Sequence, residues 1–291
     1  MTSTSITFPD RVRDAANFLM TNRLPRRQLT RLFGWYSKLE QPWVAQPSLA
    51  LWRRVADLHL EEAEQQQFRS LHECFVRRLK PGARPLCTDA DTLCSPSDAI
   101  IGACGTVREG QVLQVKGQAY PLADLLLDDG LARRHEGGLF ITLRLTSSMY
   151  HRFHAPCDLQ IQRVTHIPGD MWNVNPPALA RVPSLFCRNE RAVIRVRCQP
   201  GGEPLTLVPV AAILVASLRL HCINALLGQA YEGPRDIPCN AGVSRGEEMG
   251  WFEHGSTIIM LAPRGWQLAP GLATGMRIRM GEALVKTAAG A

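Results

Sequence analysis

The chain has 291 residues, 45% hydrophobic and 20% charged, which is ordinary for a soluble globular protein with a substantial core. A membrane-spanning helix needs about 20 apolar residues, and the best candidate, residues 205–218, contains Pro209, so no such helix is expected. The net charge of +7 is uneven, because residues 1–60 hold nine Arg or Lys against four Asp or Glu. A basic end suits nucleic acid or an anionic membrane, where each basic residue contributes about 1 kcal/mol.

Residues 1–80 are predicted to be helical and amphipathic. A first helix has an apolar stripe at helical spacing, and a second is expected to begin after Pro47, with Ser48 as its cap. A third begins at the capping pair Ser70 and Glu73 and carries Phe75. These helices either lie on a membrane or pack against the body or a second subunit. Their apolar positions are Leu29, Leu32, Phe33 and Tyr36 in the first helix and Leu51, Trp52, Val55 and Leu58 in the second, with Trp35 and Trp43 as further interfacial side chains.

Beyond residue 84 the sequence changes to short apolar runs separated by Gly, Pro and Asp, which is typical of strands. Residues 205–218 are predicted to form one or two buried strands, and helices are expected at 122–127 and 149–153. The pattern predicts an α+β, strand-rich and mainly antiparallel fold. The other predicted strands are 100–107, 111–116, 139–145, 159–167, 192–197 and 257–261.

Gly255-Ser256-Thr257, before an apolar run, has the composition that backbone self-cleavage requires. The serine hydroxyl can attack the preceding carbonyl and convert the peptide bond into an ester, because glycine permits a strained turn. Elimination of the ester would leave a ketone, a pyruvoyl group, at the new N-terminus. Alone, the tripeptide is weak evidence, because such hydroxyls commonly bond to nearby backbone.

Several further motifs, in matching order and spacing, support this interpretation. Over residues 24–285 the chain closely resembles the bacterial phosphatidylserine decarboxylase proenzymes. The segments that carry the resemblance are Leu29-Thr30-Arg31-Leu32-Phe33-Gly34-Trp35, Phe75-Val76-Arg77, Ser95-Pro96-Ser97-Asp98, Val115-Lys116-Gly117-Gln118-Ala119-Tyr120, Tyr150-His151-Arg152-Phe153-His154-Ala155-Pro156-Cys157, Ile167-Pro168-Gly169-Asp170-Met171-Trp172-Asn173-Val174-Asn175, Arg188-Asn189-Glu190-Arg191 and Gly246-Glu247-Glu248-Met249-Gly250-Trp251-Phe252.

The resemblance implies a barrel-sandwich type of β core in a catalytic domain, residues 81–291, behind an N-terminal membrane-associating region, residues 1–80. It also implies a cut between Gly255 and Ser256 into a β chain, 1–255, and an α chain, 256–291. The covalent pyruvoyl group derived from Ser256 would form a Schiff base with phosphatidylserine, releasing CO2 and phosphatidylethanolamine.

Three site residues for self-cleavage follow from the resemblance. His154 matches the family's base, Asp98 matches the carboxylate that orients it, and Ser256 is the nucleophile, a charge-relay set like that of serine proteases. His151 matches a histidine that acts later, during decarboxylation. Each has a structural alternative, since a histidine is often a satisfied core group and Asp98 can be a turn residue.

Two departures from the family pattern bear on processing. Ala99 stands where a glycine commonly follows the aspartate, and His254 where leucine commonly precedes the Gly-Ser pair. Alanine next to the orienting carboxylate can slow self-cleavage if the turn there needs glycine. His151, His154 and Cys157 have a spacing that suits a metal, but Pro156 interrupts any helix and no second cluster completes a site, so no metal is predicted.

The expected partners are anionic membranes that contain phosphatidylserine and a second copy of the chain, and the apolar residues of the basic end argue against nucleic acid. The nine scattered cysteines include no Cys-x-x-Cys pair, and no secretory signal precedes the first helix, so reduced thiols on the cytoplasmic side of the cell membrane, as a peripheral protein, are expected. Alternatives are a pyruvoyl-dependent decarboxylase of another amino acid or serine lipid, a non-catalytic lipid-binding relative and, less favoured, a serine hydrolase, which lacks its Gly-x-Ser-x-Gly elbow.

Overall fold

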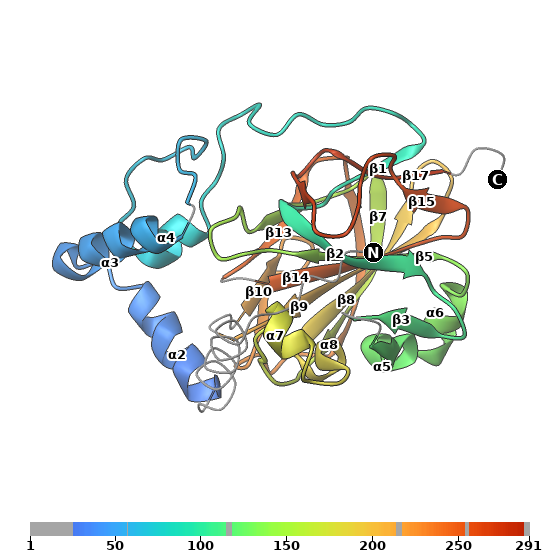
Figure 1. Cartoon of the computed structure of the whole chain (residues 1–291), viewed down its shortest axis with the longest axis horizontal. Helices are drawn as coiled ribbons and strands as arrows, with labels where there is room; N and C mark the ends of the chain where they lie inside the picture. The colour runs from blue at the N-terminus through green and yellow to red at the C-terminus, as the bar shows by residue number, and fades with distance from the viewer. Residues whose placement is uncertain (1–25, 57, 115–117, 214–216, 254–255, 288–291) are drawn as a thin grey trace, which may run out of the picture.

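The computed structural model describes residues 26–56, 58–114, 118–213, 217–253 and 256–287. Of the motif residues, Val115, Lys116, Gly117, His254 and Gly255 lie outside this part, and for Ser256 only the backbone is described. The fold is mixed α and β, with three helices at the N-terminal side and a body built on an eight-stranded sheet (Figure 1).

The N-terminal helices are α2 (Arg26–Ser37), α3 (Pro42–Val55) and α4 (Leu71–Phe75). Ser70 caps α4 by accepting from the Glu73 amide at 3.1 Å, as the sequence predicts. They lie together on one side of the body in Figure 1, and a small apolar cluster of their own surrounds Leu49 and Phe68. The link from α4 to the body crosses residues 76–91, which contain no named element.

The second predicted helix starts at the wrong residue. α3 begins five residues before Pro47, because Pro42 occupies the first turn, where a missing N–H costs nothing. Ser48 therefore lies inside the helix, where its Oγ donates to the Val44 carbonyl at 2.7 Å and does not cap. Leu58 lies beyond the end of α3.

The main sheet places β14, which starts at Ser256, near its centre. Its strand order is β12-β7-β8-β9-β14-β5-β2-β16, and every pair of named strands is antiparallel. The α+β, strand-rich and mainly antiparallel class expected from the sequence is confirmed, and the sheet is open, with no closed barrel in the described residues. Its strands are β2 (Ala99–Thr106), β5 (Leu139–Arg144), β7 (Leu159–Ile167), β8 (Arg191–Cys198), β9 (Pro204–Ala211), β12 (Asp236–Val243), β14 (Ser256–Ala262) and β16 (Arg277–Ile278).

Three smaller sheets and four short helices complete the body. The sheets have the orders β1-β17-β15, β11-β10-β13-β6 and β3-β4. The strands are β1 (Thr92–Cys94), β3 (Gln111–Leu113), β4 (Ala119–Pro121), β6 (Arg152–His154), β10 (Ser217–Leu220), β11 (Ala225–Gly228), β13 (Glu248–Phe252), β15 (Trp266–Leu268) and β17 (Ala283–Thr287), and the helices are α5 (Leu122–Leu126), α6 (Asp129–Arg134), α7 (Pro176–Leu179) and α8 (Leu185–Arg188).

Both faces of the main sheet are buried, which explains why its central strands are apolar without alternation. In β14, Ile258 and Met260 belong to one core, with residues of β6, β10, β13 and β17, whereas Ile259 and Leu261 belong to a second, with α5–α8. In the segment 205–218, β9 ends at Ala211 and β10 begins at Ser217, which fits the prediction of one or two buried strands, and residues 214–216 lie outside the described part. The helix expected at 149–153 is absent, because β6 occupies Arg152–His154 and pairs with β13.

Candidate active site

Ser256 is the first residue of β14 and lies in register with Ala211 of β9. The next residue, Thr257, is in register with Val210 of β9 and with Arg144 of β5. The predicted scissile bond therefore lies where the chain enters the middle of the main sheet. Strand pairing on both sides fixes the backbone that follows the predicted scissile bond, which favours a defined geometry for residue 256.

The motif that contains Trp172 and the motif that contains Asn189 are hydrogen-bonded to each other and to β9. The Asn189 side chain donates to the carbonyls of Trp172 and Ala211 at 2.9 and 2.8 Å and accepts from the Trp172 amide at 2.8 Å. The buried Arg191 guanidinium donates to four backbone carbonyls, and burial lowers its pKa to about 10. These polar side chains hold the loop and the strand that border Ser256, so their role is to position backbone.

His154 is buried at the end of β6 and has both ring nitrogens engaged. Nδ1 lies 2.9 Å from the Gly246 carbonyl and therefore donates to it, and Nε2 lies 2.9 Å from the Tyr150 hydroxyl. Gly246 has φ of +78°, and a Cβ there would collide with Leu86, so the motif glycine is needed to present this carbonyl. Burial lowers the pKa of His154, which leaves a neutral imidazole with Nε2 as the acceptor.

Asp98 lies close to His154 in the fold, but its carboxylate pairs with another residue. The Pro96 carbonyl accepts from the His154 amide at 2.8 Å, which joins the two motifs. The two Asp98 oxygens accept from Nε and Nη2 of Arg84 at 2.8 and 2.6 Å, and Oδ1 also accepts from the Met280 amide at 2.9 Å. No hydrogen bond joins Asp98 to His154 in the described residues, so a relay through Asp98 requires a rearrangement.

Ala99 lies in β2 and is fully buried, and its φ is not positive. Any residue adopts extended backbone of this kind, so the position next to Asp98 does not require glycine.

His151 is fully buried and donates from Nδ1 to the Met149 carbonyl at 2.8 Å. Its ring centroid lies 3.9 Å from that of Phe75, which in turn stacks on Trp52 at 6.1 Å with an interplanar angle of 13°. Phe75 and Trp52 both line a cavity, and the histidine therefore lies directly behind that cavity's aromatic wall.

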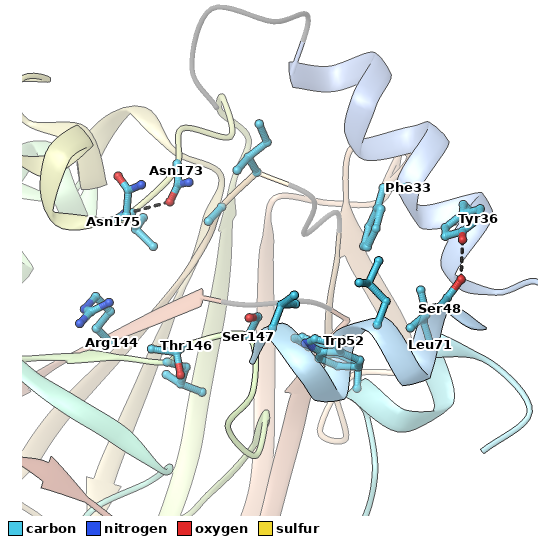
Figure 2. A pocket seen from close by; sticks show the side chains of 17 residues that line it. Phe33, Tyr36, Ser48, Trp52, Leu71, Arg144, Thr146, Ser147, Asn173 and Asn175 are labelled. Carbon is cyan, nitrogen blue, oxygen red and sulfur yellow. Dashed lines mark hydrogen bonds between the residues drawn. The ribbon is translucent and has the colours of Figure 1, made fainter. Parts of the chain in front are cut away.

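The cavity has a volume of about 600 Å³ and lies between the N-terminal helices and the body (Figure 2). Phe33 and Tyr36 from α2 and Ser48 from α3 lie on one side, and Arg144, Asn173 and Asn175 on the other. The remaining lining residues are Leu51, Trp52, Val55, Leu71, Phe75, Leu145, Thr146, Ser147, Val174, Ala212 and Ile213. Ala212 comes directly after Ala211, which pairs with Ser256, so the cavity adjoins the start of β14. Its size and mainly apolar lining suit a lipid or another apolar ligand.

The N-terminal helices are fixed to the motif loop on the far side of this cavity. The Arg26 guanidinium pairs with Asp170 at 2.5 Å and lies 3.8 Å from the centroid of the Trp172 ring. Such an ion pair with a cation–π contact ties α2 to the segment that begins at Ile167. The cavity is therefore formed jointly by the helices and the body.

The structure brings together more than the sequence predicts. The Pro96 carbonyl links the Asp98 motif to His154, and the carbonyl of His151 accepts from the Phe252 amide at 3.1 Å, four residues before Ser256. No hydrogen bond in the described residues joins these side chains to the backbone of Ser256. The sequence predicts no role for two side chains that contact them, Arg84 and Tyr150. Tyr150 opens a recognised motif, and burial raises the pKa of its hydroxyl well above the usual value. Nothing local marks Arg84, which precedes a proline in an irregular segment.

Comparison with known proteins gives one consistent result. The profile of the phosphatidylserine decarboxylase family matches residues 71–286. Proteins named phosphatidylserine decarboxylase proenzyme from Yersinia enterocolitica, Yersinia pestis and Yersinia pseudotuberculosis are each 34% identical over 290 residues, covering 94% of this chain and 97% of theirs. The chain belongs to the phosphatidylserine decarboxylase family. This family is one of carboxy-lyases, and the word proenzyme in its relatives' names fits a chain that is processed after synthesis.

Proposed function

We propose that this chain is a self-processing, pyruvoyl-dependent phosphatidylserine decarboxylase that acts on anionic membranes. One observation carries the proposal. In a chain related over 94% of its length to such proenzymes, Ser256 starts a central strand beside an apolar cavity that is also lined by the N-terminal helices.

Self-cleavage is assigned to Ser256, His154 and Asp98. The Ser256 hydroxyl attacks the Gly255 carbonyl, and the resulting ester eliminates the Gly255 carboxylate, after which hydrolysis releases ammonia. His154 is neutral and presents Nε2 as proton acceptor, and a positioned general base contributes about 10²- to 10⁴-fold in rate. The serine must replace Tyr150 as the donor to Nε2. Asp98 can orient His154 only if its carboxylate gives up its hydrogen bonds to Arg84 and accepts one from the imidazole of His154.

The pyruvoyl group, once formed, supplies an electrophilic carbonyl and an electron sink for the loss of CO2 from a primary amine substrate. The residues around Ser256 fit a pyruvoyl group at this position. The backbone of Ser256 lies beside two cavity residues, Arg144 of β5 and Ala212 after β9. We assign the proton transfer of decarboxylation to His151, and because its ring lies behind Phe75, this role requires Phe75 to move aside.

A lipid substrate is supported by the surface around the cavity. Leu51 and Val55 line it and are also 62% and 74% exposed, so the cavity is continuous with an apolar surface. Further exposed apolar side chains on α2 and α3 are Leu32, Trp35 and Trp43. The described helices include none long and apolar enough to span a bilayer. We therefore assign residues 1–80 to reversible membrane binding and residues 81–291 to catalysis.

Mass spectrometry of the intact protein tests the processing. The expected products are chains 1–255 and 256–291, the second without an N-terminal amine. Ser256→Ala should abolish both cutting and CO2 release from phosphatidylserine vesicles, whereas Ser244→Ala, at an exposed serine, should change neither. An active wild-type chain that is uncut, or a C-terminal piece that begins with an intact serine, would overturn the mechanism.

Vesicle pelleting tests the membrane assignment. Replacing Trp35 and Trp43 with Ser should weaken binding to phosphatidylserine vesicles at least about tenfold, because each large aromatic loses its apolar burial in the interface. Gln28→Ala, an exposed polar position of α2, is the matched control. Equal CO2 release from soluble serine or tryptophan and from vesicles would favour the soluble substrate instead.

Two further parts of the proposal need their own measurements. All nine cysteines lie in the described part and are free thiols there. Fractionation of cells with and without high salt tests a peripheral cell-membrane location. The expected homodimer is tested by light scattering of the purified protein, for which a monomer mass would be the contrary result.

A further inference from the structure

Arg144, the last residue of β5, separates two cavities. It lines the 600 Å³ cavity described above and a second cavity of about 380 Å³, which is bordered mainly by apolar residues of β2, α7 and α8. It lies in register with Thr257 on one side and with Ile100 on the other. Arg144 therefore lines both cavities. It pairs with the residue directly after Ser256.

Among the described residues, no anion compensates this cation. Arg144 is only partly exposed, and it makes no hydrogen bond or ion pair with any residue that the structure describes. Burial alone lowers its pKa. A half-buried guanidinium without a partner is costly, and the cost is recovered when a ligand anion occupies the site.

Two hydroxyls next to Arg144 are also without partners. Thr142 is 3% exposed and Thr257 is fully buried, and neither Oγ1 has a hydrogen-bond partner among the described residues. Residues 142 and 144 share one face of β5, because side chains alternate along a strand, and Thr257 is directly opposite Arg144. All three residues line the second cavity, so one cation and two buried hydroxyls border the same space.

We propose that Arg144, Thr142 and Thr257 bind the phosphodiester of the lipid headgroup. This inference rests on the proposed function and names how its substrate is held. The planar guanidinium matches phosphate oxygens with two parallel donors, and the hydroxyls supply further donors.

The substrate also carries a carboxylate, but the phosphodiester is the better occupant of this site. A cation on the carboxylate would stabilise the charge that decarboxylation removes, and would therefore favour the ground state over the transition state. The phosphodiester keeps its charge throughout the reaction. Holding it next to Thr257 places the amine and carboxylate ends of the same headgroup near position 256.

The test compares Arg144→Gln, Arg144→Lys and Thr142→Val with the wild type. We expect all three to be cut, as measured by intact mass, because the site binds substrate and supplies no group to the cleavage. In Arg144→Gln the KM for phosphatidylserine should rise about tenfold or more with kcat changed less than threefold, the effect of losing charge-assisted hydrogen bonds. Arg144→Lys should recover part of this loss.

Two small anions distinguish the phosphodiester from the carboxylate. Dimethyl phosphate should inhibit the wild type, and its inhibition constant should rise about tenfold in Arg144→Gln and a few-fold in Thr142→Val. Propionate should inhibit all forms alike. An unchanged constant for dimethyl phosphate, or a loss confined to propionate, overturns the inference even when the wild type is fully active. If Arg144→Gln does not fold, the Lys and Val variants decide by the same constants.

Failure of the proposed function would look different. A wild-type chain that is neither cut nor active on phosphatidylserine overturns that function. Ligand-observed NMR of dimethyl phosphate with the wild type and Arg144→Gln then tests the site alone, and equal binding to both rejects it.

Discussion

The ion pair between Arg84 and Asp98 should be one of the larger single contributions to the stability of the body. The two side chains are only 7% and 12% exposed and are joined by two hydrogen bonds of 2.8 and 2.6 Å. Burial opposes the charge of Arg84, but the bonds to Asp98 and Glu62 outweigh it and raise its pKa. Removing one partner leaves a buried charge uncompensated, which costs about 3–5 kcal/mol.

The perturbation is Arg84→Met, Asp98→Asn and the double variant, all made in Ser256→Ala so that every chain is uncut. Each single change should lower the melting temperature by roughly 6–20 °C at about 2–4 °C per kcal/mol, measured by calorimetry. The double variant should lose less than the sum of the two, with a coupling of about 2 kcal/mol. Arg279→Met is the matched control, because Arg279 also pairs with Glu62, at 3.2 Å, but is 58% exposed and should cost under about 1 kcal/mol.

A shift in Arg84→Met as small as that in Arg279→Met, or strict additivity in the double variant, would refute this reasoning. The same substitutions with Ser256 restored separate the two roles of Asp98. If Asp98 orients His154, Asp98→Asn should slow cutting at a temperature where it is fully folded, whereas Arg84→Met should not.

Three further predictions concern other groups. The rate of self-cleavage should be constant above neutral pH and fall only below pH 6.5, because the lowered pKa of His154 keeps its imidazole neutral and able to accept a proton. A pH-jump series followed on gels measures this rate. A midpoint above pH 6.5 would contradict the assignment. Burial lowers the pKa of His135 to about 4 from 6.5, so the stability it contributes is complete above pH 6.5 and falls by about 3 kcal/mol as the pH drops towards 4. Urea unfolding should therefore show less acid sensitivity in His135→Gln, and equal sensitivity would reject the assignment. Phe75→Ala should cost about 3–5 kcal/mol and reduce decarboxylation more than cutting, because it removes the ring that lies on His151; equal losses would contradict the separation of roles.

The sequence predicts the strands and helices whose residues carry their own signal. Runs of apolar residues predict β5, β7, β8 and β14 to within one or two residues, and the Ser70–Glu73 pair predicts the start of α4. The predicted start of α3 lies too late in the chain, because Pro42, and not Pro47, provides its first turn. Residues 149–153 have helical composition, but pairing with β13 determines their conformation.

The candidate site was predictable only in part, for a physical reason. Motifs predict His151, His154 and Asp98 as candidate site residues, but hydrogen-bond partners depend on tertiary packing that no local pattern specifies. Arg84 is fourteen residues from Asp98 and follows no motif, and Arg144 lies within an apolar strand where a cation looks like a polar end residue. Their importance appears only when burial and partners are known.

The position of β14 has a consequence for the processed molecule. The segment after the cut supplies β14 between β9 and β5, β16 at an edge of the same sheet, and β17 between β1 and β15. A molecule cut before Ser256 would therefore be a heterodimer of two chains, and strands of the smaller chain would lie between strands of the larger one. These strand pairs would form while the chain is still continuous. Renaturation of that heterodimer becomes a second-order event between two incomplete polypeptides, whereas the unbroken precursor needs only its own sequence. The proposed processing would thus make recovery of the fold depend on protein concentration.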